Sequence, residues 1–398
     1  MAEGGSSRGA SLWRRLGTLG SDLGAAIRRT VGFARRLGGL PYAEGPLRRA
    51  GLVAAAAADE LLLACFQQLH APVDDEAFAV TLAESGQLVD YLAERGALAS
   101  PASFHIAPGP ARLTESARRA GHISFGHATY PSPYAPAPAM PGASRYAEHT
   151  RNELAHAWLL RAGHGAPWVV CVHGAGMGDP VADLAVFRAS SLHSAGFNVA
   201  IPVLPHHGPR GVGRLSLAFP SDDPAGNLHG AAQAIMDVRA LLSYIAERGE
   251  RAVLYGISLG AYVAAAVASL EPAVAGVVVG VPVVDIPDLL RTHAPARFAR
   301  HPRFADLCKI ASLLDPITSP VGLATPAVPF RRIWAGRADR LVRPQQVDRL
   351  ASHWGTDVSW YQGGHLGFFG SPTVRRCVSD ALVEAEVAQR VRGRLVAV

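Results

Sequence analysis

The 398-residue sequence predicts an α/β protein with a mostly parallel sheet and helices on both of its faces. One observation is the continuous apolar run Trp168–Val172, which is typical of a strand buried on both sides. A second is the alternation of short apolar runs with amphipathic helical patterns after residue 145, as βαβ units produce. A third is that glycine-rich turns follow two of these runs directly.

The pattern divides the chain into three parts: a basic leader over residues 1–50, expected to be flexible, a helical extension with a Pro-rich connector over 51–144, and the α/β domain over 145–398. The extension is expected to contain helices at Leu52–Leu69 and Asp75–Arg95. Pro282–Pro329 is too long for a simple connection between strands, so we expect a cap there.

The expected elements of the α/β domain alternate between the two types. In chain order they are strand Trp168–Val172, helix Asp183–Ala195, strand Asn198–Leu204, helix Asn227–Arg248, strand Ala252–Gly256, helix Leu259–Leu270, strand Val274–Val284, strand Arg332–Ala335, helix Gln345–Trp354, strand Val358–Tyr361 and helix Thr373–Val391.

The charge is placed unevenly along the chain. Residues 1–50 hold nine arginines against Glu3, Asp22 and Glu44, so this segment carries the whole formal net charge of +6. The remaining residues are neutral, which argues against a nucleic-acid partner because such an enzyme would carry its charge around its cleft. Apolar residues recur at helical spacing in the leader, which allows peripheral contact with an anionic membrane. Because its charge lies far from the motifs below, we expect deletion of residues 1–49 to leave turnover nearly unchanged.

The four cysteines are far apart, with neither CxxC nor metal-ligand spacing, so nothing in the sequence requires an oxidising compartment or a metal. Glycines and an aspartate interrupt the N-terminus, which lacks the uninterrupted apolar stretch of a signal peptide. We therefore expect a cytoplasmic protein, possible membrane contact aside, with no metal and no cofactor.

Gly256-Ile257-Ser258-Leu259-Gly260 follows one predicted strand and opens a helix. Such a strand–turn–helix context is what a nucleophile elbow needs, because glycines on both sides of the serine let strand and helix approach closely. Ser258 is the candidate nucleophile.

The second glycine-rich turn, His173-Gly174-Ala175-Gly176-Met177-Gly178, directly follows another predicted strand. Its backbone can present N–H donors to a developing oxyanion, so we expect an oxyanion hole from the N–H of Leu259 and that of Ala175 or Gly174. A dinucleotide-binding loop is the alternative, but the spacing is G-x-G-x-G and no acidic residue ends the next strand.

Two further strands end in candidate partners for the serine. Asp339 lies in the turn after Arg332–Ala335, and His365 in the Gly363-Gly364-His365-Leu366-Gly367 turn after the last strand. A serine hydroxyl needs a base, and that imidazole needs a carboxylate to fix its tautomer. Ser258, Asp339 and His365 occur in the chain order that this chemistry has in α/β hydrolases.

With these motifs, residues 145–395 resemble the α/β-hydrolase superfamily of esterases, lipases, dienelactone-hydrolase-like and prolyl-oligopeptidase-like enzymes. HGAGMG, GISLG, GRADRLV and GGHLGFF stand where that superfamily carries its oxyanion loop, nucleophile, acid and base. The resemblance implies the fold and the triad but not the substrate, and the first 140 residues match no part of the common core.

We therefore expect a serine hydrolase acting on a small-molecule or lipid-like carboxylic ester through an acyl-enzyme. An acyltransferase or a peptidase would use the same three residues, and a non-catalytic binding protein on the same fold is the alternative of another class. His206 and His207 follow the next strand and are candidate substrate contacts, as are His173 and Met177 in the oxyanion loop. The oligomeric state is not predicted.

Overall fold

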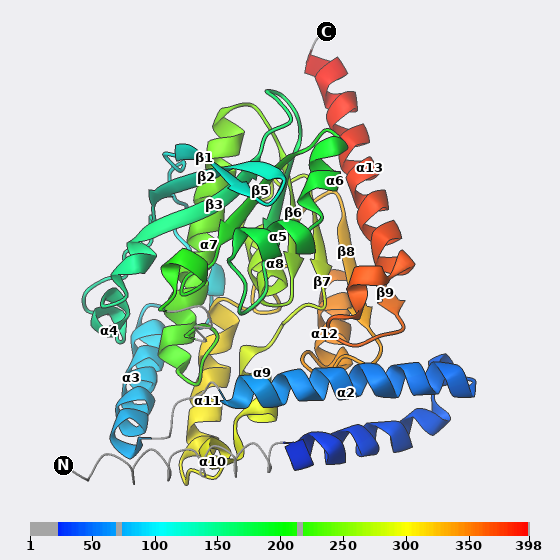
Figure 1. The fold of residues 1–398 in the computed structure, drawn as a ribbon. Helices are drawn as coiled ribbons and strands as arrows, with labels where there is room; N and C mark the ends of the chain where they lie inside the picture. The colour runs from blue at the N-terminus through cyan, green and yellow to red at the C-terminus, as the bar shows by residue number, and fades with distance from the viewer. Residues whose placement is uncertain (1–22, 69–73, 213–217, 397–398) are drawn as a thin grey trace, which may run out of the picture.

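The computed structural model describes residues 23–68, 74–212 and 218–396. Nine strands form one sheet in the order β1-β2-β3-β5-β4-β6-β7-β8-β9 (Figure 1). The six strands from β5 to β9 in this order run parallel, and β1, β2 and β3 extend the sheet with antiparallel pairings. The strands are β1 (Thr114–Ala120), β2 (Ile123–Pro131), β3 (Leu154–Leu160), β4 (Trp168–Val172), β5 (Asn198–Val203), β6 (Ala252–Ile257), β7 (Gly276–Gly280), β8 (Arg331–Gly336) and β9 (Val358–Tyr361).

Helices cover both faces of this sheet, as predicted. Alternate side chains of β4 divide between the two cores: Val170 packs with α7, α8 and α12, whereas Val169 and Cys171 pack with α5, α6 and α13. These helices are α5 (Pro180–Val186), α6 (Ala189–Ser194), α7 (Pro224–Glu247), α8 (Leu259–Leu270), α12 (Pro344–Trp354) and α13 (Pro372–Val396).

The sheet begins earlier than the expected domain boundary at residue 145. Strands β1 and β2 form an antiparallel hairpin within residues 51–144, and the short helix α4 (Ala143–Ala147) follows them. The sequence of β1, Thr-Glu-Ser-Ala-Arg-Arg-Ala, lies mostly exposed at the sheet edge and has no apolar alternation to reveal it. The region expected to be only helices and connector therefore contributes to the α/β sheet.

The cap region expected at Pro282–Pro329 is helical. It contains α9 (Ile286–His293), α10 (Ala296–Ala299) and α11 (Phe304–Leu314), inserted between β7 and β8. Leu307 and Ala311 of α11 pack against Phe78 and Leu82 of α3 (Asp75–Glu94). The N-terminal extension and the cap thus share a small core.

The described part of the basic leader is structured, which corrects the expectation of a flexible segment. Residues 23–36 form a helix that pairs with α2 (Pro46–Gln68), and Figure 1 shows this helical hairpin lying across one end of the sheet. Phe33 and Leu37 are buried with Leu52 of α2 and with Ala338 of the α/β domain. Apolar burial holds the segment in place despite its glycines.

By length and composition, residues Pro46–Gln67 of α2 could cross a membrane. The helix nevertheless carries Asp59 and Glu60, whose buried carboxylates contact the α/β domain. Two such charges in one bilayer-spanning segment would cost several kcal/mol, so α2 is better explained as a helix packed on the protein.

Candidate active site

Ser258 occupies a sharp turn between β6 and α8. Its backbone has φ 58° and ψ −117°, a strained conformation for a residue with a side chain. A Cβ on Gly260 would clash with the carbonyl group of Val172, and one on Gly256 would clash with the first turn of α8. The two glycines therefore let the helix start against the sheet, so that the serine is presented at the carboxyl end of β6.

Asp339 and His365 meet Ser258 at this edge of the sheet. The Ser258 Oγ lies 3.0 Å from His365 Nε2, and His365 Nδ1 lies 2.8 Å from Asp339 Oδ2. Since a carboxylate can only accept, Nδ1 carries the proton and Nε2 of the neutral ring is free to accept from the serine hydroxyl. The three side chains thus form one hydrogen-bonded chain.

The carboxylate of Asp339 is held independently of the histidine. Its Oδ1 accepts from the backbone N–H groups of Leu341 and Val342, both at 2.9 Å. These bonds leave Oδ2 directed at the imidazole, so the turn after β8 sets the orientation of the acid.

Opposing influences act on the His365 imidazole. Burial disfavours the imidazolium, but the charge of Asp339, its hydrogen bond and the charge of Asp59 together raise the pKa of His365 above its ordinary value. The ring is therefore a stronger base than a free histidine, as proton abstraction from a serine requires.

The residues expected to form an oxyanion hole lie beside the serine. Leu259 is the first residue of α8, where a backbone N–H has no acceptor within the helix. Gly174 lies so close that a Cβ built on it would be 3.3 Å from the Ser258 Cβ, and Ala175 follows it in the turn after β4. The Met177 sulphur lies near Gly174, 3.8 Å from the same built Cβ position.

Both ring nitrogens of His173 form hydrogen bonds with backbone groups of the protein. Its Nε2 accepts from the Leu204 N–H at 3.1 Å, so Nδ1 carries the proton and donates to the Gly174 carbonyl at 2.9 Å. Burial lowers the pKa of His173 to about 4, so the ring is neutral. Both ring nitrogens are used within the protein, which corrects the expectation of a polar substrate contact.

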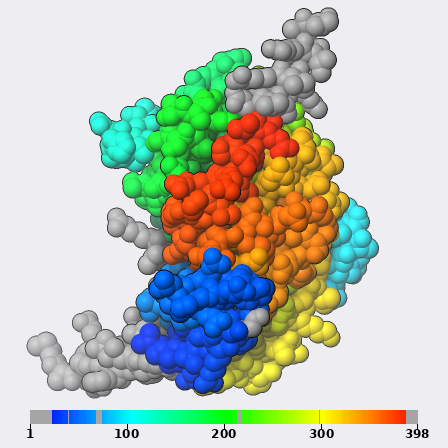
Figure 2. Space-filling view, turned by 90° about the vertical axis from the view of Figure 1, so that its right-hand side faces the viewer, coloured from blue at the N-terminus to red at the C-terminus, as the bar shows by residue number. Residues whose placement is uncertain are grey.

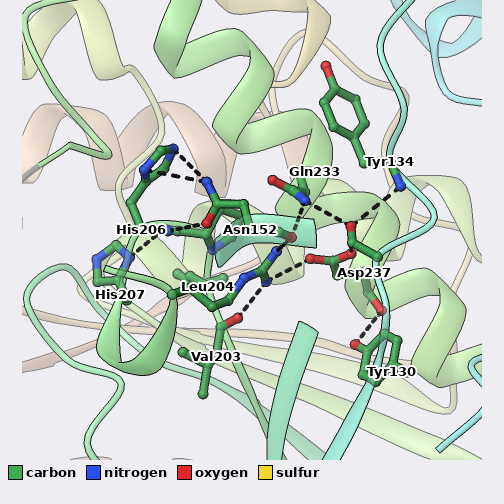
Figure 3. Close-up of polar contacts among 12 residues, drawn as sticks. Tyr130, Tyr134, Asn152, Val203, Leu204, His206, His207, Gln233 and Asp237 are labelled. Atoms are coloured by element: carbon green, nitrogen blue, oxygen red, sulfur yellow. Dashed lines mark hydrogen bonds and ion pairs between the residues drawn. The ribbon is translucent and has the colours of Figure 1, made fainter. Parts of the chain in front are cut away.

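His206 and His207 are also buried, and Figure 3 shows the polar contacts around them. The His206 ring lies 3.1 Å from the Asn152 side-chain nitrogen, and His207 donates from Nδ1 to the Pro205 carbonyl at 2.8 Å. Burial lowers the pKa of each ring to about 3. Beside them, Arg210 and Asp237 form a buried ion pair of 2.8 Å that helps to hold the loop after β5.

Asp59 is the site residue that the sequence analysis missed. Its Oδ2 accepts from the backbone N–H groups of His365 at 2.8 Å and Arg340 at 2.9 Å, from a helix outside the sheet. Burial and the charge of Asp339 raise the pKa of Asp59 to about 6. The available signal was an acidic pair, Asp59-Glu60, inside an apolar helical run, because buried acids need partners.

Within the described ranges 23–68, 74–212 and 218–396, no three histidine, cysteine or acidic side chains lie together as a metal site would need. The arrangement of Ser258, His365 and Asp339 offers a candidate nucleophile, base and orienting acid, with backbone N–H groups beside them.

Comparison with known proteins agrees with this architecture. Residues 169–397 match the model of the "Alpha/beta hydrolase family". Two Mycobacterium tuberculosis proteins are similar along most of their length: "Uncharacterized protein MT2702" of strain CDC 1551 / Oshkosh at 42% identity, and "Uncharacterized protein Rv2627c" of strain ATCC 25618 / H37Rv at 41%. Each similarity extends over 353 residues and covers 85% of this chain and 84% of the relative.

Similar solved structures include acetyl xylan esterase 1 from Thermoanaerobacterium sp. JW/SL YS485, at 17% identity and a TM-score of 0.49, covering 72% of this chain and 92% of the esterase. The acetyl xylan esterase from Paenibacillus sp. R4 has 15% identity and a TM-score of 0.49. The match covers 74% of this chain and 97% of that esterase. The family model spans more than half of the sequence and includes the strands that carry all three site residues. The chain belongs to the alpha/beta hydrolase family.

Proposed function

We propose that this protein is a serine hydrolase that cleaves a carboxylic ester through an acyl-enzyme intermediate. The observation that carries the proposal is the hydrogen-bonded chain from Ser258 through His365 to Asp339, at the carboxyl ends of three strands. A strained serine with a neutral, correctly protonated imidazole beside it is the arrangement that activates a hydroxyl for acyl transfer.

The reaction begins when Ser258 Oγ attacks the ester carbonyl and its proton moves to His365 Nε2. Asp339 stabilises the resulting imidazolium, and the carbonyl oxygen, now negative, accepts hydrogen bonds from the N–H groups of Leu259 and Ala175 or Gly174. The tetrahedral intermediate collapses, and the alcohol leaves with the proton from His365.

Water completes the cycle. His365 takes a proton from a water molecule, whose oxygen attacks the acyl-serine, and then returns the proton to Ser258 as the carboxylic acid leaves. An acceptor alcohol in place of water would give acyl transfer, and an amide in place of the ester would give peptidase activity, with the same proton movements.

The test combines labelling with turnover. A fluorophosphonate probe should label the wild-type protein at Ser258 and leave Ser258→Ala unlabelled, while p-nitrophenyl esters of increasing acyl length report the preferred chain. A wild-type protein that neither takes the label nor hydrolyses any ester in the series would instead support a binding protein on this fold. Labelling without ester hydrolysis would direct the search to amides or acyl acceptors.

A further inference from the structure

The inner face of α2 reaches the two turns that complete the triad. The Asp59 carboxylate bridges the N–H of His365, in the turn after β9, and that of Arg340, in the turn after β8. Gly364 makes this approach possible, because a Cβ there would lie 2.7 Å from Asp59 Oδ2. One side chain of the extension therefore ties together the turns that carry the base and the acid.

Neighbouring contacts fix Asp59 relative to these turns. Glu60 is buried between Arg29 of the leader helix and Arg340, whose Nε is 3.0 Å from Glu60 Oε1. Ala338 is buried against Phe33 and Leu37 of the hairpin. The turn holding Asp339 is thus enclosed by residues far from it in sequence.

We propose that Asp59 is a positioning residue, which holds His365 and the Asp339 turn in productive geometry through its two backbone hydrogen bonds. This inference rests on the proposed serine hydrolase function. Asp59 acts through the turns after β8 and β9, because its carboxylate accepts hydrogen bonds from the backbone N–H groups of Arg340 and His365. Misplacing a base by about 1 Å can cost on the order of 100-fold in rate.

The charge of Asp59 gives the test a second readout, because that charge also contributes to the raised pKa of His365. Charged or titratable groups face Asp59 from several elements. They are Asp339 and Arg340 after β8, Tyr361 in β9 and His365 after β9. The adjacent Glu60 is paired with Arg29 of the leader helix and with Arg340.

Two substitutions separate position from charge. Asp59→Ala removes the hydrogen bonds and should lower kcat for p-nitrophenyl acetate by about 10- to 100-fold with little change in KM. Asp59→Asn keeps a carbonyl acceptor and should restore most of kcat, while the acidic limb of kcat/KM moves to lower pH because His365 loses a neighbouring negative charge.

Glu60→Gln is the matched control, since Glu60 is the next residue of the same helix and is equally buried. It should lower the melting temperature without moving the acidic limb. A folded Asp59→Ala protein with wild-type kcat, or an unmoved limb in Asp59→Asn, overturns the inference. The proposed function fails separately, if the wild-type protein itself is not labelled by the fluorophosphonate at Ser258.

The outer face of α2 carries a different, independent observation. Residues 50–65 contain two charged residues, Asp59 and Glu60, and both lie on the buried side. The exposed side is a stripe of uncharged residues at helical spacing: Leu47, Ala50, Ala54, Ala58, Leu61 and Cys65. This distribution is the reverse of an ordinary surface helix, which places its polar residues outward.

The hairpin surface carries arginines as well as apolar residues. Figure 2 shows the hairpin, in blue, on the molecular surface beside the orange residues of the C-terminal part of the sheet domain. The leader helix exposes Leu23, Ile27 and Val31 four residues apart. Exposed arginines lie on both helices of the hairpin, at positions 28, 35 and 36 of the leader helix and 48 and 49 of α2.

We infer that the hairpin surface binds an anionic lipid bilayer, with the outer stripe of α2 at the boundary between headgroups and acyl chains. Apolar residues beside arginines match both components of such a surface. The exposed arginines of the hairpin would repel those of a second copy placed face to face, which favours an anionic lipid surface over self-association. The helix lies on the membrane and does not cross it, since Asp59 and Glu60 stay bound to the α/β domain.

Cys65 provides the probe, because it is exposed while the other three cysteines are buried. An environment-sensitive fluorophore on Cys65 should shift to the blue with vesicles containing phosphatidylglycerol, less so with phosphatidylcholine alone, and the shift should weaken as salt is raised. Leu61→Gln should reduce vesicle binding, whereas Val80→Gln on α3, with similar exposure, should not.

No shift with anionic vesicles overturns this inference. So does a concentration-dependent dimer that buries the probe in the absence of lipid, as measured by analytical ultracentrifugation, because the stripe would then be an interface between copies. A salt-independent shift of equal size with both lipids also contradicts it.

Discussion

Ser258 and His365 lie 3.0 Å apart but are held in place by different parts of the molecule. The serine is positioned locally, by the turn from β6 into α8 and by glycines that let strand and helix touch. The turns with Asp339 and His365 instead depend on Asp59, Glu60 and an apolar cluster from the N-terminal hairpin. In the proposed site, the nucleophile half is thus built by the α/β core, and the acid–base half is completed by the extension.

The largest effect is expected where both halves meet. Ser258→Ala and His365→Ala should each lower ester turnover by about 10⁴-fold or more, and Asp339→Asn by a similar or smaller factor. Because the three act as a unit, the Ser258/His365 double variant should be no worse than either single variant. Steady-state kinetics with matched circular dichroism spectra checks this, and near-normal turnover in Ser258→Ala would refute the assignment.

Deletion of residues 1–49 is expected to have the next largest effect, and it tests whether the acid–base half depends on the extension. It removes Arg29, Phe33 and Leu37, which contact Glu60 and Ala338, so kcat should fall by about 10-fold or more and the melting temperature should drop. This reverses the sequence-based expectation that the leader is dispensable. Deleting only residues 1–22 spares these contacts and serves as the control; equal activity in both proteins would contradict the dependence.

Gly364→Ala examines the same dependence with one methyl group. The new Cβ would lie 2.7 Å from Asp59 Oδ2 and displace either the carboxylate or the His365 turn. We expect a drop in kcat of about 10-fold, while Gly370→Ala, where the added atom meets nothing within 4 Å, should be neutral. If the two variants have the same kinetics, the packing of Asp59 against this turn is unimportant for activity.

The pH profile of the unaltered protein should show the smallest effect. The base must be neutral, so kcat/KM should fall as pH drops through the pKa of His365, which the two carboxylates raise above its ordinary value. We expect the midpoint of this acidic limb to lie above 6.5, measured with a soluble short-chain ester whose hydrolysis is corrected for buffer. A midpoint below 6.5 would mean that burial of the ring outweighs the effect of the two carboxylates on the pKa of His365.

The sequence allowed the three residues of the candidate triad to be predicted, but not Asp59, which contacts two of the turns that carry them. Ser258, Asp339 and His365 could be identified because each follows a recognisable apolar strand, and parallel strands bring their carboxyl ends to one edge. An insertion between β7 and β8 was predicted from segment length, but its helices were not. In contrast, the partner of Asp59 lies 306 residues away, and no local pattern specifies such a contact.

Two other differences have similar physical causes. The edge strand β1 is exposed and charged, so it lacks the apolar signal on which strand prediction depends. His173 lies in the predicted oxyanion loop and His206 and His207 follow β5, but whether a histidine faces a substrate or a backbone group depends on packing. Their positions in the sequence made these histidines candidate substrate contacts. Their actual hydrogen-bond partners could be identified only from the three-dimensional structure.

The separation of Asp59 from His365 also has a consequence for how the protein is made. At a synthesis rate of about 5–20 residues per second, α2 leaves the ribosome roughly 15 to 60 s before the turn that it holds. During that interval the acidic pair and the apolar faces of the hairpin lack their partners in the α/β domain, so they are exposed to aggregation. Under the proposed serine hydrolase function, catalytic competence is then acquired only after the turn with His365 leaves the ribosome, so a prematurely terminated chain lacks hydrolase activity.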